Sequence, residues 1–247
     1  MMDIFYTLLS QIHVLIGGRT GAGKSVLIAG ILYTAMISDP RRLRLVLIDP
    51  KRVELSTFRN APHVDLYASE PLEMLRALQT CENIMDLRYQ TMQAMGEKCS
   101  REPPIYIVID ELADLLDVCG KPAMRSLKRL LQLGRAAGIH VIAATQHISR
   151  ATLPAALQVN FPAIVALPQR SGIESRQMIG TRGAESLDIG EAYIITPETR
   201  QPRRVHIPRV SDADILDSLH LWDAPDPAPE PPKRSFLARL LDGILLA

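Results

Sequence analysis

The sequence predicts an α/β fold with a mostly parallel central sheet and helices on both faces. Two observations carry this prediction. Short, continuously apolar segments alternate with longer segments whose apolar residues have helical spacing, and strand–helix–strand repeats of this kind form parallel sheets. A glycine-rich loop also joins the first apolar strand, residues 13–16, to the first helical segment, residues 26–36. The 247 residues suffice for one large domain, and the alternation shows no division into two.

The glycine-rich loop fits the pattern G-x-x-x-x-G-K-[ST] between Gly18 and Ser25, which predicts a P-loop NTPase. Glycines let the backbone N–H groups point inward, and a helix N-terminus favours anions. Lys24 is expected to reach the β- and γ-phosphates of ATP, and the Ser25 hydroxyl to hold Mg²⁺. The flanking strand and helix argue against the alternative, a turn that binds nothing. The expected nucleotide contacts are Gly18, Arg19, Thr20, Gly21, Ala22, Gly23, Lys24, Ser25 and Val26.

An acidic pair follows a later strand. Residues 43–48 predict a second strand, residues 70–95 a long helix, and residues 105–109 a buried strand that ends in Asp110 and Glu111. Ligands bind at the carboxyl ends of parallel strands. Asp110 is therefore expected in the Mg²⁺ shell, and Glu111 is expected to polarise the attacking water. The alternative is that both acids only begin the next helix, where they favour the dipole.

The remaining elements continue the alternation. Residues 124–135 predict a helix with one basic face, for which a solvated surface is the simpler interpretation. Residues 139–144 predict a third strand, which ends in Thr145 and Gln146, and Gln146 is placed to sense phosphate or position water. Further strands are expected at 163–167, 192–196 and 205–207.

Composition excludes several classes of protein. The 28 basic and 27 acidic residues exclude a globally cationic nucleic-acid binder, so a DNA contact would need a local patch or an oligomer. Three cysteines without metal-ligand spacing favour a reducing compartment. No apolar run reaches the roughly 18 residues of a membrane span, and residues 1–11 lack signal-peptide features. The predicted location is cytoplasmic.

The C-terminal part differs in composition from the rest. We expect a motor domain over residues 1–221, a Pro-rich linker over 222–232 and a short amphipathic helix over 233–247. The apolar stripe of that last segment suits a protein partner, a membrane interface or docking on the chain's own domain.

Several longer phrases carry a family resemblance. They are Ile48-Asp49-Pro50-Lys51 with Glu54-Leu55-Ser56 and Pro62-His63, Met85 with Arg88-Tyr89, Asp110-Glu111-Leu112-Ala113-Asp114-Leu115, and Gly134-Arg135-Ala136-Ala137-Gly138-Ile139-His140 with Ala144-Thr145-Gln146. Further on come Asn160-Phe161-Pro162, Glu174-Ser175-Arg176 and Gly183-Ala184-Glu185-Ser186-Leu187. In these phrases the chain resembles the FtsK and SpoIIIE family of DNA-translocating ATPases, from about residue 11 to residue 207. The resemblance implies a RecA-like motor in a ring, expected to be a hexamer, with double-stranded DNA in the pore and ATP at subunit boundaries.

The resemblance also implies an arginine that completes the site of a neighbouring subunit. Arg135 and Arg176 are both candidates, and the sequence does not choose between them. Three features depart from the family. Gln158 stands where Lys is common, the segment from Gly183 to Tyr193 is about one residue shorter than usual, and twelve residues precede His13 where a further domain is usual. Whether the chain is a minimal motor, a fragment or a reduced paralogue therefore stays open.

The function expected from these residues is that of an ATPase that translocates double-stranded DNA. Two alternatives remain. One is a coupling or secretion ATPase of a conjugative or export system, acting on a protein or nucleoprotein substrate, which the C-terminal segment favours. The other is an ATP-binding module that is no longer a motor, which the short N-terminal part favours.

Overall fold

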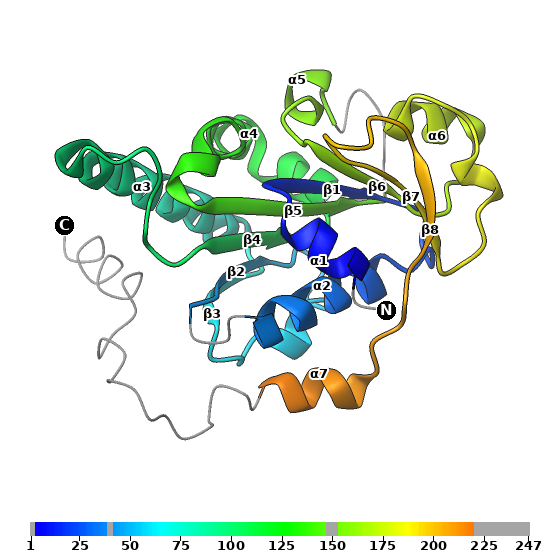
Figure 1. The fold of residues 1–247 in the computed structure, drawn as a ribbon, viewed down its shortest axis with the longest axis horizontal. Helices are drawn as coiled ribbons and strands as arrows, with labels where there is room; N and C mark the ends of the chain where they lie inside the picture. The colour runs from blue at the N-terminus through cyan, green and yellow to red at the C-terminus, as the bar shows by residue number, and fades with distance from the viewer. Residues whose placement is uncertain (1–2, 39–41, 147–152, 220–247) are drawn as a thin grey trace.

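The computed structural model describes residues 3–38, 42–146 and 153–219. These residues form an eight-stranded sheet with the strand order β3-β2-β4-β5-β1-β6-β7-β8 (Figure 1). The strands from β3 to β6 along this order are parallel, and β7 and β8 are antiparallel to their neighbours. The strands are β1 (His13–Gly17), β2 (Arg44–Ile48), β3 (Val64–Ala68), β4 (Ile105–Ile109), β5 (Ile139–Thr145), β6 (Ala163–Ala166), β7 (Glu191–Ile195) and β8 (Arg203–His206).

Helices cover both faces of the sheet, as Figure 1 shows. Side chains alternate across each strand, so Leu15 faces the layer of α3 and α4, whereas Val14 and Ile16 face the layer of α1, α2 and α7. The helices are α1 (Asp3–Leu9), α2 (Lys24–Ser38), α3 (Pro71–Met95), α4 (Leu112–Ala137), α5 (Ala155–Gln158), α6 (Gly172–Ile179) and α7 (Asp212–Leu219), with 3-10 turns η1 (Ser56–Phe58) and η2 (Ala184–Ser186). The predicted fold class is confirmed.

Most predicted elements lie where the sequence placed them, with one extension. The helix expected at 124–135 belongs to α4, which begins at Leu112 and is interrupted at Gly120, where the backbone adopts φ 60° and ψ −146°. Pro122 follows, and it cannot donate a helical hydrogen bond. β3, an edge strand whose side chains are mostly half-buried, was not predicted, because its Val-Asp-Leu-Tyr-Ala sequence lacks a continuous apolar run.

The strand order brings three loops to one edge of the sheet. β5 lies between β1 and β4, and all three strands are parallel. The glycine-rich loop after β1, the acidic pair after β4 and Gln146 after β5 therefore share the carboxyl edge.

Two regions fall outside this description. The expected linker at 222–232 and amphipathic helix at 233–247 lie beyond the described residues. Among the helices that the structure describes, none combines the length and apolar character needed to cross a bilayer.

The contact between α1 and α2 yields a stability prediction. Gly30 of α2 lies against the buried ring of Phe5, and an added Cβ would overlap that ring. We expect Gly30→Ala to lower the free energy of unfolding by about 1 to 2 kcal/mol, since overpacking outweighs the helix propensity gained. Denaturant unfolding would measure it. The double variant Phe5→Leu/Gly30→Ala should be less destabilised than the sum of the single changes, and strict additivity would contradict the contact.

Candidate functional site

The glycine-rich loop is anchored to the sheet at both sides. The Gly18 N–H donates to the Thr145 carbonyl at 3.2 Å, and the Arg19 N–H donates to the Pro168 carbonyl at 3.0 Å. A Cβ at Gly18 would lie 2.8 Å from that of Leu167, so the chain after β6 leaves no room for a side chain there. Gly21 and Gly23 have φ of 74° and 94°, a region that favours glycine. The loop conformation therefore requires these glycines.

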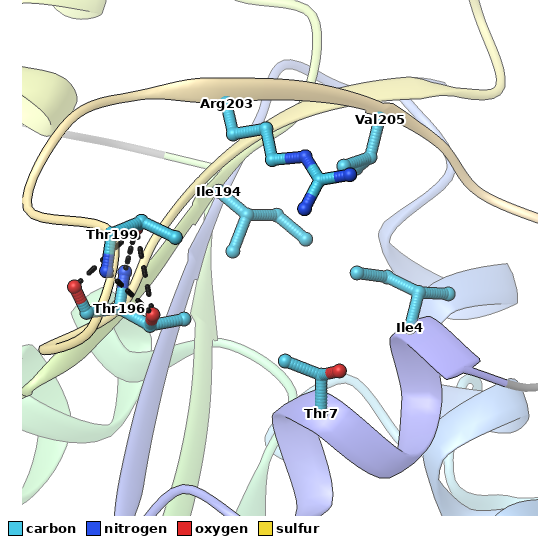
Figure 2. Close-up of a pocket in the computed structure, with 7 residues that line it drawn as sticks. All are labelled: Ile4, Thr7, Ile194, Thr196, Thr199, Arg203 and Val205. Atoms are coloured by element: carbon cyan, nitrogen blue, oxygen red, sulfur yellow. Dashed lines mark hydrogen bonds between the residues drawn. The ribbon is translucent and has the colours of Figure 1, made fainter.

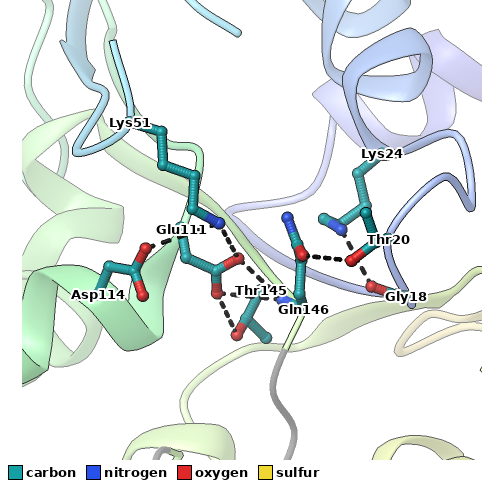
Figure 3. Close-up of polar contacts among 8 residues, drawn as sticks. All are labelled: Gly18, Thr20, Lys24, Lys51, Glu111, Asp114, Thr145 and Gln146. Carbon is teal, nitrogen blue, oxygen red and sulfur yellow. Dashed lines mark hydrogen bonds and ion pairs between the residues drawn. The ribbon is translucent and has the colours of Figure 1, made fainter. Parts of the chain in front are cut away.

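Lys24 begins α2 and its side chain crosses the loop. Its Nζ donates to the Gly18 carbonyl at 3.0 Å, and the residue is only 7% exposed (Figure 3). Burial lowers the pKa of Lys24, and the charges of Glu111 and Asp110 oppose that shift. A phosphate group would compensate the ammonium better than a neutral carbonyl does.

Glu111 is fully buried and is held by three donors, which Figure 3 shows. Its Oε1 accepts from the Thr145 hydroxyl at 2.7 Å and from the Gln146 N–H at 3.0 Å. Its Oε2 lies 3.1 Å from the same N–H and 3.3 Å from Nζ of Lys51. The carboxylate thus faces the carboxyl edge in a defined orientation.

Gln146 connects the loop to the acidic pair. Its side-chain Oε1 accepts from the Thr20 hydroxyl at 2.8 Å, while its backbone N–H binds Glu111 (Figure 3). One residue therefore touches both the glycine-rich loop and the expected base. The structure brings Thr20, Lys24, Glu111 and Gln146 to the same edge of the sheet.

Asp110 lies where negative charge accumulates. Burial raises its pKa to about 7, and the charges of Glu54, Asp49 and Glu111 add to the shift while Lys51 opposes it. A divalent cation would relieve this repulsion, so the surroundings of Asp110 fit Mg²⁺. Among the described residues there is no group of three or more His, Cys, Asp or Glu side chains placed to hold a metal. A P-loop Mg²⁺ site needs only a hydroxyl and a carboxylate, because water and phosphate oxygens supply the rest.

Two further residues, Asp49 and Lys51, belong to this site although the sequence predicted no role for them. Asp49 follows β2 and is fully buried, and its Oδ2 accepts from the Leu55 N–H and the Tyr67 hydroxyl, each at 3.1 Å. Lys51 contacts Glu111, and its Nζ also lies 3.6 Å from Oδ2 of Asp114. The sequence could have indicated both residues, because they directly follow β2. β2 is parallel to β4, and the carboxyl ends of parallel strands share the ligand-binding edge of a sheet.

The two candidate arginines lie at opposite edges of the sheet. Arg135 is exposed in the last turn of α4, just before β5 begins, whereas Gln146 directly follows the end of β5. The seven residues of β5 separate them by about 20 Å. Arg176 is exposed on α6, which follows β6 at the edge of the glycine-rich loop.

Hollows flank the loop on its apolar side. One has a volume of about 180 Å³ and is lined by Gly23, Val26, Leu167 and Ile189, among others. A larger hollow of about 430 Å³ shares Val26 and Arg209 with it and includes Ser25 and Glu54.

A third hollow, of about 220 Å³, is lined by α1, β7 and β8 (Figure 2). β7 is antiparallel to β6, so Thr196 and Thr199 at its end lie at the amino edge, away from the loop. Its lining holds one charged residue, Arg203, and no acid, so it lacks the groups of a hydrolytic site.

Known proteins match this chain in sequence and in fold. The sequence profile of the FtsK/SpoIIIE family matches residues 4–102 and 91–150, which is more than half of the chain. The chain belongs to the FtsK/SpoIIIE family. The resemblance stated from the sequence phrases is thereby confirmed.

Relatives within the FtsK/SpoIIIE family are longer than this chain. The DNA translocase FtsK of Sporosarcina ureae is 34% identical, in an alignment that covers 82% of this chain and 29% of the relative. The DNA translocase FtsK of Staphylococcus aureus strain Mu50 is 33% identical, with 84% and 29% covered. The chain thus spans about 29% of the length of these relatives.

Solved structures share the fold. The pCW3 conjugation coupling protein TcpA, a monomer form with ATPgS, has a TM-score of 0.75 at 19% identity, with 87% of this chain and 66% of that chain covered. The cytoplasmic domain of the Thermomonospora curvata type VII secretion ATPase EccC has a TM-score of 0.74 at 22% identity, with 90% and 30% covered. These likenesses concern the arrangement of strands and helices.

Proposed function

We propose that this chain is an ATP-hydrolysing motor domain that moves double-stranded DNA. One observation carries the proposal: in a member of the FtsK/SpoIIIE family, Gln146 connects the phosphate-binding loop at Thr20 to the buried carboxylate of Glu111. ATP would bind with its phosphates in the loop. Lys24 would exchange its bond to the Gly18 carbonyl for phosphate oxygens.

Ser25 and Asp110 would hold Mg²⁺, which supplies positive charge beside the phosphates when bound. Glu111 would accept a proton from the attacking water as the water oxygen bonds to the γ-phosphorus. The bond from that phosphorus to the β-phosphate oxygen breaks, and ADP leaves with this oxygen. The Thr20 hydroxyl fixes the orientation of the Gln146 side chain, and Gln146 would then hold the water in line with the bond that breaks.

The remaining positive charge would come from another subunit. Arg176 and Arg135 are exposed at opposite edges of the sheet, so a ring of identical subunits, which we propose to be a hexamer, could bring one of them to a neighbour's site. Several modest basic surfaces facing one pore would also neutralise DNA phosphates without making the chain cationic. We place this activity in the cytoplasm.

The central test compares ATP hydrolysis by the purified chain with and without duplex DNA. Duplex DNA should raise the rate, and Lys24→Ala serves as the control for contaminating ATPases. A rate that duplex DNA does not change would remove DNA translocation from the proposal. Gel filtration with a non-hydrolysable ATP analogue tests the ring, because a strict monomer could not place an arginine at a neighbour's phosphate.

A coupling or secretion ATPase remains the second candidate. The fold that this chain shares with TcpA and EccC, together with the apolar stripe in the sequence of residues 233–247, favours it. Deleting residues 224–247 should then abolish capture of a protein substrate while leaving ATP hydrolysis intact. If the truncated chain captures the protein substrate as well as the full chain does, the apolar stripe of residues 233–247 no longer favours a coupling or secretion ATPase.

The apolar hollow beside the loop yields a binding prediction. The other side of the loop is occupied by Gln146 and Glu111, so we expect the purine base to enter the hollow lined by Val26 and Ile189. Ile189→Asp should weaken ATP binding about tenfold by removing apolar contact. Its affinity for inorganic tripolyphosphate should match that of the wild type.

The matched control is Ile173→Asp on α6. Ile173 is 63% exposed and Ile189 is 68% exposed, so both changes place a charge on an open surface. Isothermal titration with both ligands makes the comparison. If Ile189→Asp weakens the binding of ATP and of tripolyphosphate equally, the purine base binds outside this hollow.

A further inference from the structure

The carboxylate of Glu111 is closed to water in the resting site, because its side chain is 0% exposed. An ionised carboxylate offers about four lone-pair positions. Three donors bind it here: the Thr145 hydroxyl at Oε1, the Gln146 N–H shared between both oxygens, and Lys51 at 3.3 Å from Oε2. A general base must accept a hydrogen bond from the water it activates. Because no part of the Glu111 side chain is open to solvent, one of these donors must move aside before water can reach it.

Only one of the three donors is free to leave. Thr145 is 1% exposed, and the Gln146 donor is a backbone group at the end of β5. The Lys51 side chain is 38% exposed and stands on a flexible stem. A second acceptor is already near, because Oδ2 of Asp114 lies 3.6 Å from the same ammonium (Figure 3).

Hydrogen bonds and an ion pair hold the backbone of the loop that carries Lys51 in place. The buried Asp49 carboxylate accepts from the Leu55 N–H and the Tyr67 hydroxyl, which closes the loop on itself and on β3. Arg52, whose φ is 59°, forms an ion pair with Glu70 at the start of α3. The backbone is thereby held while the Lys51 side chain keeps its freedom, so a change at this point is a change of side-chain partner.

We infer that Lys51 is a latch on the catalytic base: its ammonium occupies Oε2 of Glu111 in the resting site and moves to Asp114 when the site becomes competent. This inference rests on the proposed function, in which Glu111 takes the proton from water. Lys51 is a positioning residue in this scheme, since it acts only through Glu111. Asp114 receives the released charge and so lowers the cost of release.

The test uses two variants with opposite expected effects, assayed on the full chain without DNA. Lys51→Met should raise kcat for ATP hydrolysis about tenfold with little change in KM, because Glu111 keeps its bonds to Thr145 and Gln146. Asp114→Asn should lower kcat about tenfold with KM unchanged, because Lys51 then has no charged alternative to Glu111. The matched control is Asp117→Asn, an exposed residue of the same helix, which should behave as the wild type.

A third variant separates a latch from a general loss of structure. Lys51→Met/Asp114→Asn should have the rate of Lys51→Met alone, since Asp114 acts only through Lys51. A kcat of Lys51→Met at or below that of the wild type would overturn the latch, and so would an Asp114→Asn variant with wild-type kcat, or hydrolysis in none of the proteins. The comparisons among variants are made without DNA. If the separate assay shows that DNA does not raise the wild-type rate, this result counts against DNA translocation and leaves the latch unaffected.

Discussion

Glu111→Gln is expected to lower the turnover of ATP by about 10²- to 10⁴-fold, the range typical of removing a general base. The amide has nearly the same shape as the carboxylate but cannot take a proton from water at neutral pH. It can still accept from the Thr145 hydroxyl, so the orientation of the side chain is largely kept. ATP should bind with near wild-type affinity, because Lys24 and the glycine-rich loop are untouched.

Two measurements check this result. The rate at saturating ATP gives the turnover, and titration of a fluorescent ATP analogue gives the affinity separately. Glu198→Gln, an exposed acid in the turn between β7 and β8, is the matched control. A Glu111→Gln rate within fivefold of the wild type would show that another group activates water.

Lys24→Ala is expected to weaken ATP binding by about 10- to 100-fold or more, and hydrolysis should fall with it. Hydrogen bonds to charged groups contribute about 1.5–3 kcal/mol each, and the ammonium of Lys24 is the only lysine group that bonds within the glycine-rich loop among the described residues. The loop itself should survive, because backbone bonds from Gly18 and Arg19 anchor it.

Thermal unfolding distinguishes lost binding from lost structure. Without nucleotide, Lys24→Ala should unfold near the wild-type Tm, because relief of the unfavourable burial of the ammonium offsets the lost bond to the Gly18 carbonyl. ATP should raise the Tm of the wild type and leave that of the variant nearly unchanged. Lys121→Ala, at an exposed position of α4, is the control. An ATP-induced shift equal to the wild type would contradict the role of Lys24.

Much of the fold was predictable because its signals are local. The β4 sequence Ile-Tyr-Ile-Val-Ile is a continuous apolar run, and parallel strands covered on both faces require such runs. The Glu70 capping box and Gly96 likewise mark the ends of α3 within a few residues. β3 escaped prediction because its sequence lacks a continuous apolar run, and its pairing with β2 stabilises it. A helix that begins at Leu112 was expected only in the alternative in which the acidic pair starts the next helix.

The sequence by itself determined the places of the glycine-rich loop, the acidic pair after β4 and Gln146 after β5, because each is a short motif at the end of a strand. Only the tertiary structure decided how these pieces meet. It placed β5 between β1 and β4, so that Gln146 touches both Thr20 and Glu111. It also brought Lys51 to Glu111 across 60 residues of sequence. Such a contact depends on strand order and register, which are set by burial of the whole sheet and not by neighbours along the chain.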